Sequence, residues 1–398
     1  MENKKVFVIN AGSSSIKLQL LDKKTLEVIV SGLAERITLK NGVVTLKYQG
    51  EKHVKNVDMA DHTKAVEVIL EMLKELEVIK DAKEIEIIGF RVVHGATYFS
   101  KPTVLGDKEI AIIDKVKVYA PLHNPGAIQA IQAFKKIMPH AKMMAEFDTA
   151  FHTTIPAVNA TYPIPFKYSQ KFGIKKYGAH GISHEYITGR LGEILKKKKV
   201  NFVNLHIGNG ASLCAIKDSK SFDTSMGLTP LAGIMMGTRS GDIDPSIHQF
   251  LAHQLNIDID EVTEILNKKS GLLGVSGISS DLRDIADAIV KGDKQAIFAF
   301  DLYTQRIADV TSCYANKIAT KLDALVFTAG GGENDPDMRK KVIEKLHFAK
   351  IKIDDKLNKG QWNGDYKLIS TGDSEIKVYA IRTNEELLIA KHAIQLFK

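Results

Sequence analysis

The sequence predicts an α/β protein built from two similar domains. Segments typical of strands alternate with segments typical of helices along its 398 residues, which is the pattern of α/β architecture. A strand, a glycine turn and a second strand occur near the start, and again about half a chain later when Gly12 is aligned with Gly210. Their separation of 198 residues (210 − 12) indicates a duplicated domain. At roughly 100–200 residues per domain, the length fits two or three domains.

The individual elements are expected from the spacing of apolar residues. Apolar side chains from Val66 to Leu76 recur at helical spacing with charged residues between them, which predicts an amphipathic helix. Helix-like stretches also cover residues 185–195 and 385–397. Short apolar runs bounded by Gly, Asn, Asp or Ser are expected to be strands. These runs are Val6–Asn10, Ile16–Leu21, Ile85–Val93, Phe202–Ile207, Leu213–Ile216, Ala324–Thr328 and Ile376–Ile381.

Composition and charge exclude several classes of protein. With 44% hydrophobic and 26% charged residues the chain has ordinary globular composition, so disorder, collagen and coiled coil are poor overall descriptions. No apolar run approaches the ~18 residues that span a bilayer, and no signal peptide is predicted. Cys214 and Cys313 are too few for a disulfide framework and lack the spacing of a zinc site. We therefore expect a cytoplasmic protein with no membrane partner.

The formal net charge of +8 is not concentrated in a nucleic-acid-binding pattern. The chain has no basic stripe interleaved with aromatic residues, so we expect no nucleic-acid partner. A mild positive field would still help to gather small anionic substrates.

Three junctions between a strand and glycines indicate a nucleotide site. After the turns at Gly12 and Gly210, a third junction places a loop of three consecutive glycines, Gly330 to Gly332, directly after an apolar run. Such glycines let backbone N–H groups approach a ligand with no side chain in the way. The P-loop pattern GxxxxGK[ST] is absent, and the first strand is not followed by GxGxxG. A nucleotide would therefore be held by another device.

The stretch of residues 223–245 is expected to be an ordered loop that lines a site. It is rich in glycine, hydroxyl and aspartate side chains and has almost no helix or strand periodicity. Its single arginine, Arg239, resembles a phosphate-facing guanidinium that offers a bidentate fork. The alternative interpretation is a glycine-rich surface turn with Arg239 in a salt bridge. The methionines in this stretch are expected in the core; they are Met226, Met235 and Met236.

Histidines follow several of the apolar runs. His180 and His184 have the i, i+4 spacing of metal ligands, but the glutamate of the HExxH pattern is missing, which disfavours a zinc hydrolase. Each of the histidines taken alone is more often a structural residue than a catalyst.

Together these motifs resemble the acetate kinase family, within the acetate and sugar kinase, heat-shock ATPase and actin superfamily. The matching segments occur in order over nearly the whole chain. In one-letter code they are VINAGSSSIK at 8–17, RVVHG at 91–95, APLHNP at 120–125, FDTAFH at 147–152, HG and SH at 180–184, GNGAS at 208–212, the loop 223–245, SGLLG at 270–274, FTAG and GEN at 327–334, and TNEEL at 383–387.

The resemblance implies a duplicated actin-like ATPase core, of the ribonuclease H-like type, with the active site in the cleft between two domains. It implies reversible transfer of the γ-phosphoryl group of ATP to acetate, giving acetyl phosphate and ADP, with Mg²⁺ or Mn²⁺ and in a homodimer. The expected domains are an acyl-kinase domain of residues 1–148 plus 386–398 and a nucleotide-binding domain of residues 149–385.

The same resemblance assigns roles to individual residues. The catalytic residues would be Arg91, Asp148, His180 and Arg239. Acetate would be bound by Arg91 and enclosed by Val93, Leu122, His123 and Pro230. The nucleotide would be held by Ser13, Ser15, Lys17, His206, Gly208, Asn209, Gly210, Asp281, Leu282, Arg283, Gly330, Gly331, Gly332, Glu333 and Asn334. Asn10 and Glu385 would hold Mg²⁺. Because a carboxylate acceptor is already ionised at neutral pH, we expect Asp148 to orient an arginine or a metal-bound water rather than to move a proton.

Two departures from the family pattern bear on specificity. Ala179 stands where the family usually has a phenylalanine beside the methyl pocket, which predicts a weaker preference for acetate over propionate. Gly331 stands where the family usually has an isoleucine near the adenine, which predicts reduced discrimination among purines. Three alternatives remain: a propionate or other short-chain acyl kinase, a pyrophosphate-linked variant, and a non-enzymatic nucleotide switch like actin or a chaperone ATPase.

Overall fold

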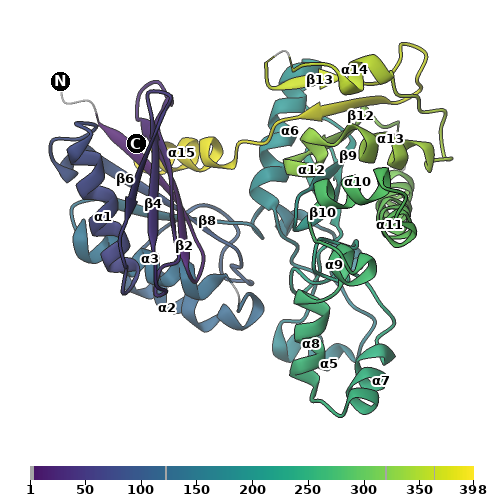
Figure 1. Cartoon of the computed structure of the whole chain (residues 1–398), viewed down its shortest axis with the longest axis horizontal. Coiled ribbons are helices and arrows are strands. Elements are labelled where there is room, and N and C mark those ends of the chain that lie inside the picture. Colours follow the sequence, from purple (N-terminus) through teal and green to yellow (C-terminus); the bar gives the residue numbers. More distant parts are fainter. Residues whose placement is uncertain (1–3, 122, 319–320, 363) are drawn as a thin grey trace. The chain divides into compact units, whose positions relative to one another are not determined.

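The computed structural model describes residues 4–121, 123–318, 321–362 and 364–398. The chain forms two compact units (Figure 1). Unit 1 comprises residues 1–151 and 384–398, and unit 2 comprises residues 152–383. In the described ranges, none of the helices combines the length and the apolar character that crossing a bilayer requires.

Unit 1 contains an eight-stranded sheet in its described residues, with the order β5-β4-β3-β2-β1-β6-β8-β7. The strands are β1 (Lys5–Ala11), β2 (Ser15–Asp22), β3 (Val28–Glu35), β4 (Val43–Tyr48), β5 (Glu51–Asn56), β6 (Ile85–Val92), β7 (Thr103–Val104) and β8 (Lys142–Phe147). Strands β1, β6 and β8 run parallel to one another. The remaining pairs are antiparallel, so a meander of five strands precedes the parallel part of the sheet.

Helices pack around the sheet of unit 1. They are α1 (His62–Glu75), α2 (Asp107–Lys115), α3 (Asn124–Ile137) and the C-terminal α15 (Glu385–Leu396). Both α3 and α15 pack on β1 and β6, and Phe134 of α3 makes edge-on contacts with Phe7 and Phe90 at 5.7 and 5.6 Å. Strands covered by helices read as nearly continuous apolar runs, which is why β1 and β6 are visible in the sequence.

Unit 2 contains a six-stranded sheet in its described residues, with the order β11-β10-β9-β12-β14-β13. The strands are β9 (Phe202–Ile207), β10 (Ala211–Lys217), β11 (Lys220–Thr224), β12 (Ala324–Thr328), β13 (Tyr366–Leu368) and β14 (Lys377–Ile381). Strands β9, β12 and β14 are parallel and the other pairs antiparallel. The order and the relative directions of these strands repeat those of β3-β2-β1-β6-β8-β7 in unit 1, so the topology confirms the predicted duplication.

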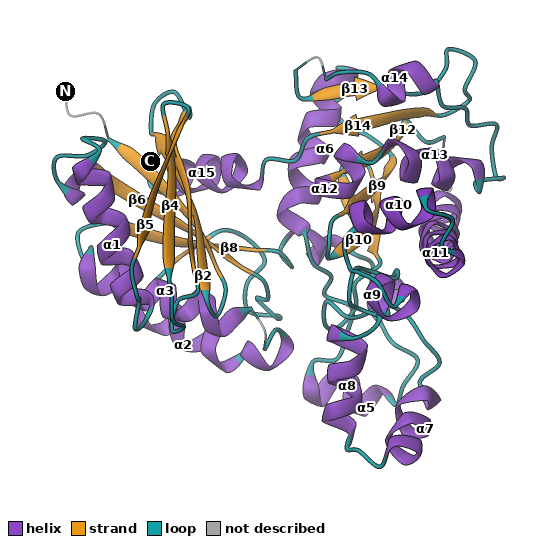
Figure 2. Ribbon diagram, viewed as in Figure 1, coloured by secondary structure: helices purple, strands orange, loops and turns teal. Residues whose placement is uncertain are grey.

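The rest of unit 2 is mostly helical, and helices surround its sheet (Figure 2). The helices are α4 (Ala157–Ala160), α5 (Phe166–Phe172), α6 (Gly181–Leu195), α7 (Ser246–Leu255), α8 (Ile259–Lys268), α9 (Gly271–Ser276), α10 (Leu282–Val290), α11 (Lys294–Ile318), α12 (Ala329–Asn334), α13 (Pro336–Glu344) and α14 (Asp355–Lys359). The long α11 packs on β9 and β10, and α6 packs on β9. The methionines of the 223–245 stretch are buried, as predicted.

Candidate active site

The residues predicted for the site fall into two groups, one in each unit, and both groups lie at strand ends. In unit 1, Asn10 is near the end of β1, Arg91 is near the end of β6, and Asp148 directly follows β8. In unit 2, the turn 208–210 follows β9, and α12 follows β12. The carboxyl ends of parallel strands lie along one edge of a sheet, which is where α/β proteins bind ligands.

Arg91 is held in a fixed orientation by Asp148. The Asp148 carboxylate is fully buried, and it accepts two hydrogen bonds from Arg91, at 2.6 Å from Nη2 and 3.2 Å from Nε. Burial opposes the charge of Arg91, but Asp148 and Glu385, which lies 3.7 Å from Arg91 Nε, outweigh it and raise the pKa of the guanidinium. A fork of this kind fixes the plane of the guanidinium, so Asp148 is placed to orient Arg91.

Glu385 begins α15 beside this pair. Burial raises its pKa to about 7, with repulsion from Asp148 and Glu386 adding to the shift and attraction to Arg91 and Lys17 opposing it. Lys17 itself forms an ion pair with Glu386. A carboxyl group whose ionisation is opposed in this way would be stabilised in its charged form by a cation. Because α15 packs on β1, which carries Asn10, the unit offers carboxylate and amide oxygens, the donors that fit Mg²⁺.

The turn between β1 and β2 carries Ser13 and Ser15. It is closed by a hydrogen bond of 2.9 Å from the Gly12 N–H to the Ser15 carbonyl, and the His62 ring nitrogen Nε2 lies 2.9 Å from the Gly12 carbonyl oxygen. A Cβ at Gly126, in the first turn of α3, would lie 2.3 Å from the Gly12 carbonyl carbon. Only glycine therefore allows α3 to approach the turn.

The segment after β6 is tied to the start of α3 by one buried side chain. The Asn124 amide accepts a hydrogen bond from the His94 N–H at 3.1 Å and donates one to the His94 carbonyl at 3.0 Å. Val93 precedes His94 and His123 precedes Asn124, so these hydrogen bonds connect the two segments that carry Val93 and His123. Leu122, also predicted for the acetate pocket, lies outside the described residues.

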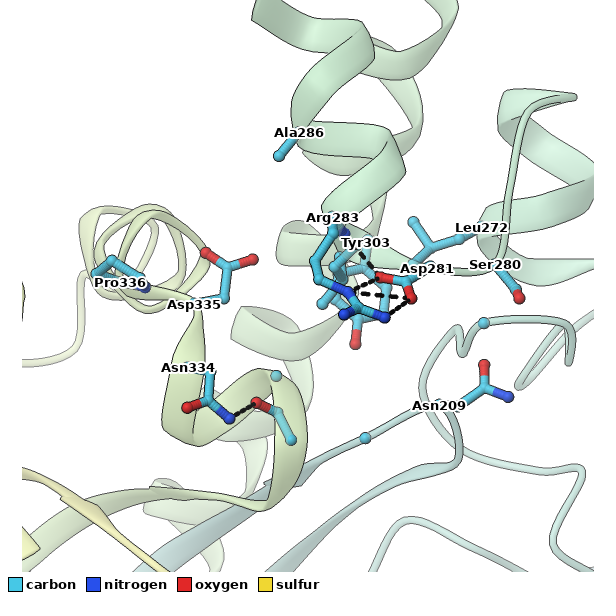
Figure 3. Close-up of a pocket in the computed structure, with 15 residues that line it drawn as sticks. Asn209, Leu272, Ser280, Asp281, Arg283, Ala286, Tyr303, Asn334, Asp335 and Pro336 are labelled. Atoms are coloured by element: carbon cyan, nitrogen blue, oxygen red, sulfur yellow. Dashed lines mark hydrogen bonds and ion pairs between the residues drawn. The ribbon is translucent and has the colours of Figure 1, made fainter. Parts of the chain in front are cut away.

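A cavity of about 730 Å³ lies in unit 2 (Figure 3), and this volume is typical of small-molecule sites. The structure brings together in its wall the predicted residues Gly208, Asn209, Asp281, Leu282, Arg283, Gly330, Gly331 and Asn334. The other described residues of unit 2 predicted for the nucleotide are not part of this wall; they are His206, Gly210, Gly332 and Glu333. Gly237 of the wall belongs to the 223–245 stretch that was expected to line a site. The wall residues that the sequence analysis did not select are Leu272, Ser280, Ala286, Tyr303, Asp335 and Pro336.

The missed residues differ in the signal that could have revealed them. Ser280 and Pro336 stand close in sequence to motifs already identified. Tyr303 lies on α11, in a stretch with no local motif, and only the packing of that helix brings it to the cavity.

Polar groups in the cavity wall are held by local bonds that Figure 3 shows. The Asp281 carboxylate caps α10 by accepting from the Arg283 N–H at 2.9 Å, and it also pairs with the Arg283 guanidinium at 2.6 Å. These bonds to Arg283 lower the pKa of Asp281 to about 2. The Asn334 amide donates to the Gly330 carbonyl at 2.9 Å. Asp281 is therefore ionised at neutral pH, and the cavity has a defined polar edge.

The three-glycine loop expected after β12 is instead a short helix, α12, which is a correction of the sequence analysis. The Glu333 carboxylate accepts hydrogen bonds from the Ala329 N–H at 2.9 Å and from the Thr383 N–H at 3.0 Å. Glu333 thus satisfies the backbone at the start of its own helix, although burial raises its pKa.

The end of α12 is held by a buried arginine. Arg339 is 1% exposed, and it donates to the Gly332 and Glu333 carbonyls at 2.9 and 3.0 Å and to the Asn358 side-chain oxygen at 2.8 Å. Burial lowers its pKa to about 10, so it remains charged at neutral pH. Its fork and the Glu333 carboxylate together explain why a glycine-rich segment is helical here.

Gly331 leaves part of the cavity wall without a side chain. A Cβ at this position would lie 3.1 Å from the Ile207 carbonyl oxygen and 3.1 Å from Leu282 Cδ1. A larger residue would therefore displace Leu282 and narrow the cavity.

Arg239 and His180 converge on one point beside this cavity. A Cβ at Gly210, at the end of the turn that lines the cavity, would lie 3.6 Å from Arg239 Nη1 and 3.7 Å from His180 Nε2. Arg239 is half-buried and donates to the Pro230 carbonyl at 3.1 Å. No carboxylate in the described ranges forms an ion pair with it, and burial alone lowers its pKa. The salt-bridge alternative is therefore wrong, and the guanidinium is available to an anion.

The duplicated sheets, together with full-length matches to solved kinase structures, define the protein as a phosphotransferase with an actin-like ATPase fold. The chain matches the acetokinase family over residues 5–391 and belongs to that family.

Relatives match over the full length. The chain is 57% identical over 392 residues to an acetate kinase of Mycoplasmopsis pulmonis, covering 98% of this chain and 99% of that protein. It is 44% identical over 396 residues to an acetate kinase of Bacillus subtilis, covering 99% and 100%. The crystal structure of Porphyromonas gingivalis acetate kinase matches with a TM-score of 0.93 at 40% identity, covering 99% and 100% of the chains. A propionate kinase from Francisella tularensis matches with a TM-score of 0.92 at 41% identity, covering 98% of each.

Proposed function

We propose that the protein transfers the γ-phosphoryl group of ATP reversibly and in line to the carboxylate of acetate, giving acetyl phosphate and ADP. The observation that carries this proposal is the convergence of Arg239 Nη1 and His180 Nε2 at Gly210, where the turn that lines the cavity ends. The transition state of phosphoryl transfer carries charge on three equatorial oxygens, so catalysis depends on donors and cations at that point. A non-enzymatic nucleotide switch would need the cavity. It would not need the Arg239 guanidinium beside the cavity with no carboxylate partner among the described residues.

Arg91 is the proposed binding group for the acetate carboxylate. Its fork is oriented by Asp148, and Val93 and His123 stand on the connected segments next to it. Since this acceptor needs no deprotonation, the orienting role of Asp148 is sufficient, and no proton transfer is proposed.

Mg²⁺ is the proposed metal ion, with Asn10 and Glu385 as the residues that would hold it. The partly buried Glu385 carboxyl group and the amide oxygen of Asn10 are suitable hard donors. The ion would neutralise charge on the nucleotide phosphates. Ser13, Ser15 and Lys17 are proposed to face those phosphates from the first turn and strand.

Acetate is favoured over propionate as the acceptor, because the full-length relatives at 57% and 44% identity are named acetate kinase. Ala179 is buried, belongs to the apolar core of unit 2, and accepts a hydrogen bond on its carbonyl from His152 Nε2 at 3.0 Å. The effect of Ala179 on acceptor choice remains a prediction. The ratio of kcat/KM for acetate and propionate, compared with the ratio in Ala179→Phe, measures it.

A cytoplasmic homodimer is the proposed state of the enzyme. Several large apolar side chains of unit 2 remain more than half exposed in the single chain, including Phe166 and Phe172 on α5, Phe250 on α7 and Ile259 on α8. Burying them against a second copy would remove apolar surface from water. Light scattering at micromolar concentration should give twice the chain mass, and a monomer mass would contradict the proposal.

Trapping of the product with hydroxylamine tests the proposed reaction. With Mg²⁺, ATP and acetate, we expect an acyl hydroxamate that is absent when acetate is omitted. Arg239→Ala should lower turnover by about 10³–10⁵-fold, the contribution of a supplied arginine in phosphoryl transfer. Hydrolysis of ATP that is independent of acetate, with no hydroxamate from any short-chain acid, would instead indicate the nucleotide switch.

A further inference from the structure

A chain of hydrogen bonds leads from His180 into the core of unit 2. The Ser212 hydroxyl oxygen lies 2.9 Å from His180 Nδ1 and 2.8 Å from His184 Nε2. His184 Nδ1 in turn lies 2.8 Å from the Asn204 amide nitrogen. Ser212, His184 and Asn204 are each fully buried. The chain therefore connects a ring at the proposed site of phosphoryl transfer to three groups that water does not reach.

The periodicities of one helix and two strands assemble this chain. His180 is the N-cap residue of α6 and His184 lies in its first turn, where the His184 N–H donates to the His180 carbonyl at 2.9 Å. Asn204 and His206 are two residues apart on β9 and share a face of the sheet. Ser212 stands opposite His206 in the register of β10 and β9. Because α6 packs on β9, all of these side chains meet between the helix and the sheet.

The direction of each hydrogen bond follows from the group at the buried end. An amide nitrogen only donates, so His184 Nδ1 accepts from Asn204. Burial lowers the pKa of His184 well below its ordinary value, with the nearby His152 and His206 adding to the shift, so the ring is neutral. A neutral ring that accepts at Nδ1 carries its proton on Nε2, and it donates to Ser212. The single hydroxyl proton of Ser212 is then left to bond His180 Nδ1.

We propose that Ser212, His184 and Asn204 are positioning residues that hold His180 as the neutral tautomer with its proton on Nε2. This inference rests on the proposed function, because it gives His180 the role of a hydrogen-bond donor to the transferring phosphoryl group. Nε2 is the ring nitrogen that faces Gly210 close to Arg239, and Nδ1 is occupied by Ser212. The ring therefore donates at the reacting centre and offers no lone pair there.

The opposite tautomer would reverse the whole chain. A proton on His180 Nδ1 would have to be donated to Ser212, and the Ser212 proton would then go to His184 Nε2. His184 would carry its own proton on Nδ1, against the Asn204 NH₂ group as the structure orients it, and two donors would face each other in a buried site. Turning the amide over would relieve that contact, but it would bury the NH₂ group where Asn204 Oδ1 has no hydrogen-bond partner. Stacking of His206 on the His180 ring, with centroids 4.2 Å apart, further fixes the ring plane.

The tautomer can be observed directly in the wild-type enzyme. In protein labelled with ¹⁵N-histidine, long-range ¹H–¹⁵N spectra distinguish a protonated from an unprotonated ring nitrogen, and His180→Gln identifies the His180 signals by their loss. We expect protonated Nε2 and unprotonated Nδ1 for His180. A proton on Nδ1, or averaged signals from two exchanging tautomers, would overturn the proposal. This measurement does not depend on catalysis, so it separates failure of the inference from failure of the proposed function.

A matched pair of serine variants tests the effect on turnover. Ser212→Ala removes the hydroxyl that bonds His180. Ser221→Ala removes a comparable hydroxyl, 1% exposed and 2.8 Å from Nδ1 of a different histidine, His152. We expect Ser212→Ala to lower kcat by about 10- to 100-fold, the range found when the hydrogen-bond partner behind a metal-bound histidine is removed. Its KM for ATP should change by less than about twofold, because ground-state binding is intact.

Ser221→Ala should keep the wild-type kcat. Equal losses in the two variants, or a kcat for Ser212→Ala within about twofold of wild type, would overturn the positioning role. In Ser212→Ala we also expect the His180 spectrum to lose its single tautomer. If that variant does not fold, the wild-type spectrum decides the question.

Discussion

Replacing Asp148 by asparagine removes one charge from the Arg91 pair without changing the size of the side chain. In the native structure both carboxylate oxygens of Asp148 accept hydrogen bonds from Arg91, at 2.6 and 3.2 Å. An amide at this position has one oxygen and one NH₂ group, so one of the two bonds becomes a contact between donors. The fork that fixes the guanidinium plane is lost, and Arg91 is free to turn toward Glu385.

The magnitude follows from burial and from what remains around Arg91. Removing one partner of a buried ion pair costs about 3–5 kcal/mol, because the other charge is left uncompensated. Here the Arg91 side chain is 19% exposed, and the Glu385 carboxylate remains 3.7 Å from Nε. We therefore expect the lower end of the range, about 3 kcal/mol in the free energy of unfolding. The pKa of Glu385 should fall, because repulsion from Asp148 is one cause of its increase.

Urea unfolding and steady-state kinetics with varied acetate measure the two effects. Glu146→Gln is the matched control, because Glu146 is 1% exposed, lies on β8 just before Asp148, and pairs with His392 at 2.8 Å instead of with Arg91. We expect Asp148→Asn to raise KM for acetate at least about tenfold, the equivalent of 1.4 kcal/mol of lost binding, while Glu146→Gln keeps the native KM. An unchanged acetate KM in Asp148→Asn would refute the orienting role. A large loss of kcat at unchanged KM would point to a proton-transfer role instead.

Three further predictions concern other parts of the structure. The Lys5 ammonium, at 2.7 Å, and two backbone N–H groups lower the pKa of Glu84 to about 2. Because the pKa is lower in the folded than in the unfolded protein, ionised Glu84 stabilises the fold. This contribution is present above pH 4.5 and is lost as the pH falls toward 2. Urea unfolding across that range should show a weaker pH dependence in Glu84→Gln, and equal slopes would contradict the assignment. The lysine in Arg339→Lys has no fork to reach the Gly332, Glu333 and Asn358 oxygens together. We therefore expect the free energy of unfolding to fall by about 2 kcal/mol or more, and calorimetry to show weaker ATP binding. Unchanged ATP affinity would show that α12 does not need these hydrogen bonds. Gly331→Ile would crowd Leu282 and should change the kcat/KM ratio between ATP and GTP by about 10-fold or more, whereas an unchanged ratio would place the base elsewhere.

Burial on both sides decides which strands could be predicted from the sequence. Strands β1, β6, β9 and β12 are almost wholly buried and were recognised as apolar runs. Strand β5 was missed, because its residues Glu51–Asn56 are mostly charged or polar and none is buried. It is held by antiparallel pairing with β4 at the edge of the sheet. Backbone pairing of this kind leaves little trace in a single sequence.

The predicted site residues stand next to strands, and the missed ones depend on tertiary contacts. Asn209 and Gly330 could be selected because each follows a recognisable apolar run. Tyr303 could not be selected, because the packing of α11 alone brings it to the cavity. The helical form of α12 was missed for a similar reason. Glycine lowers helix propensity by about 1 kcal/mol relative to alanine, and the Arg339 fork that helps to offset this comes from the next helix, α13, rather than from the glycine-rich segment.

One topology presents two different sets of groups, because the residues that differ lie at or just after the carboxyl ends of the parallel strands. In unit 1 the parallel strands end at Asn10, Arg91 and Asp148, whose charged and amide side chains suit a metal ion and a small carboxylate. In unit 2 the corresponding strands β9 and β12 end in the turn 208–210 and in α12, which present mostly backbone to a cavity. These positions are polar and lie outside the apolar core, so they can differ between the two copies without changing that core, even where a pair such as Arg91 and Asp148 adds stability of its own. A duplicated fold can therefore keep one core plan while the groups at its strand ends diverge, as the proposed acetate and nucleotide sites require.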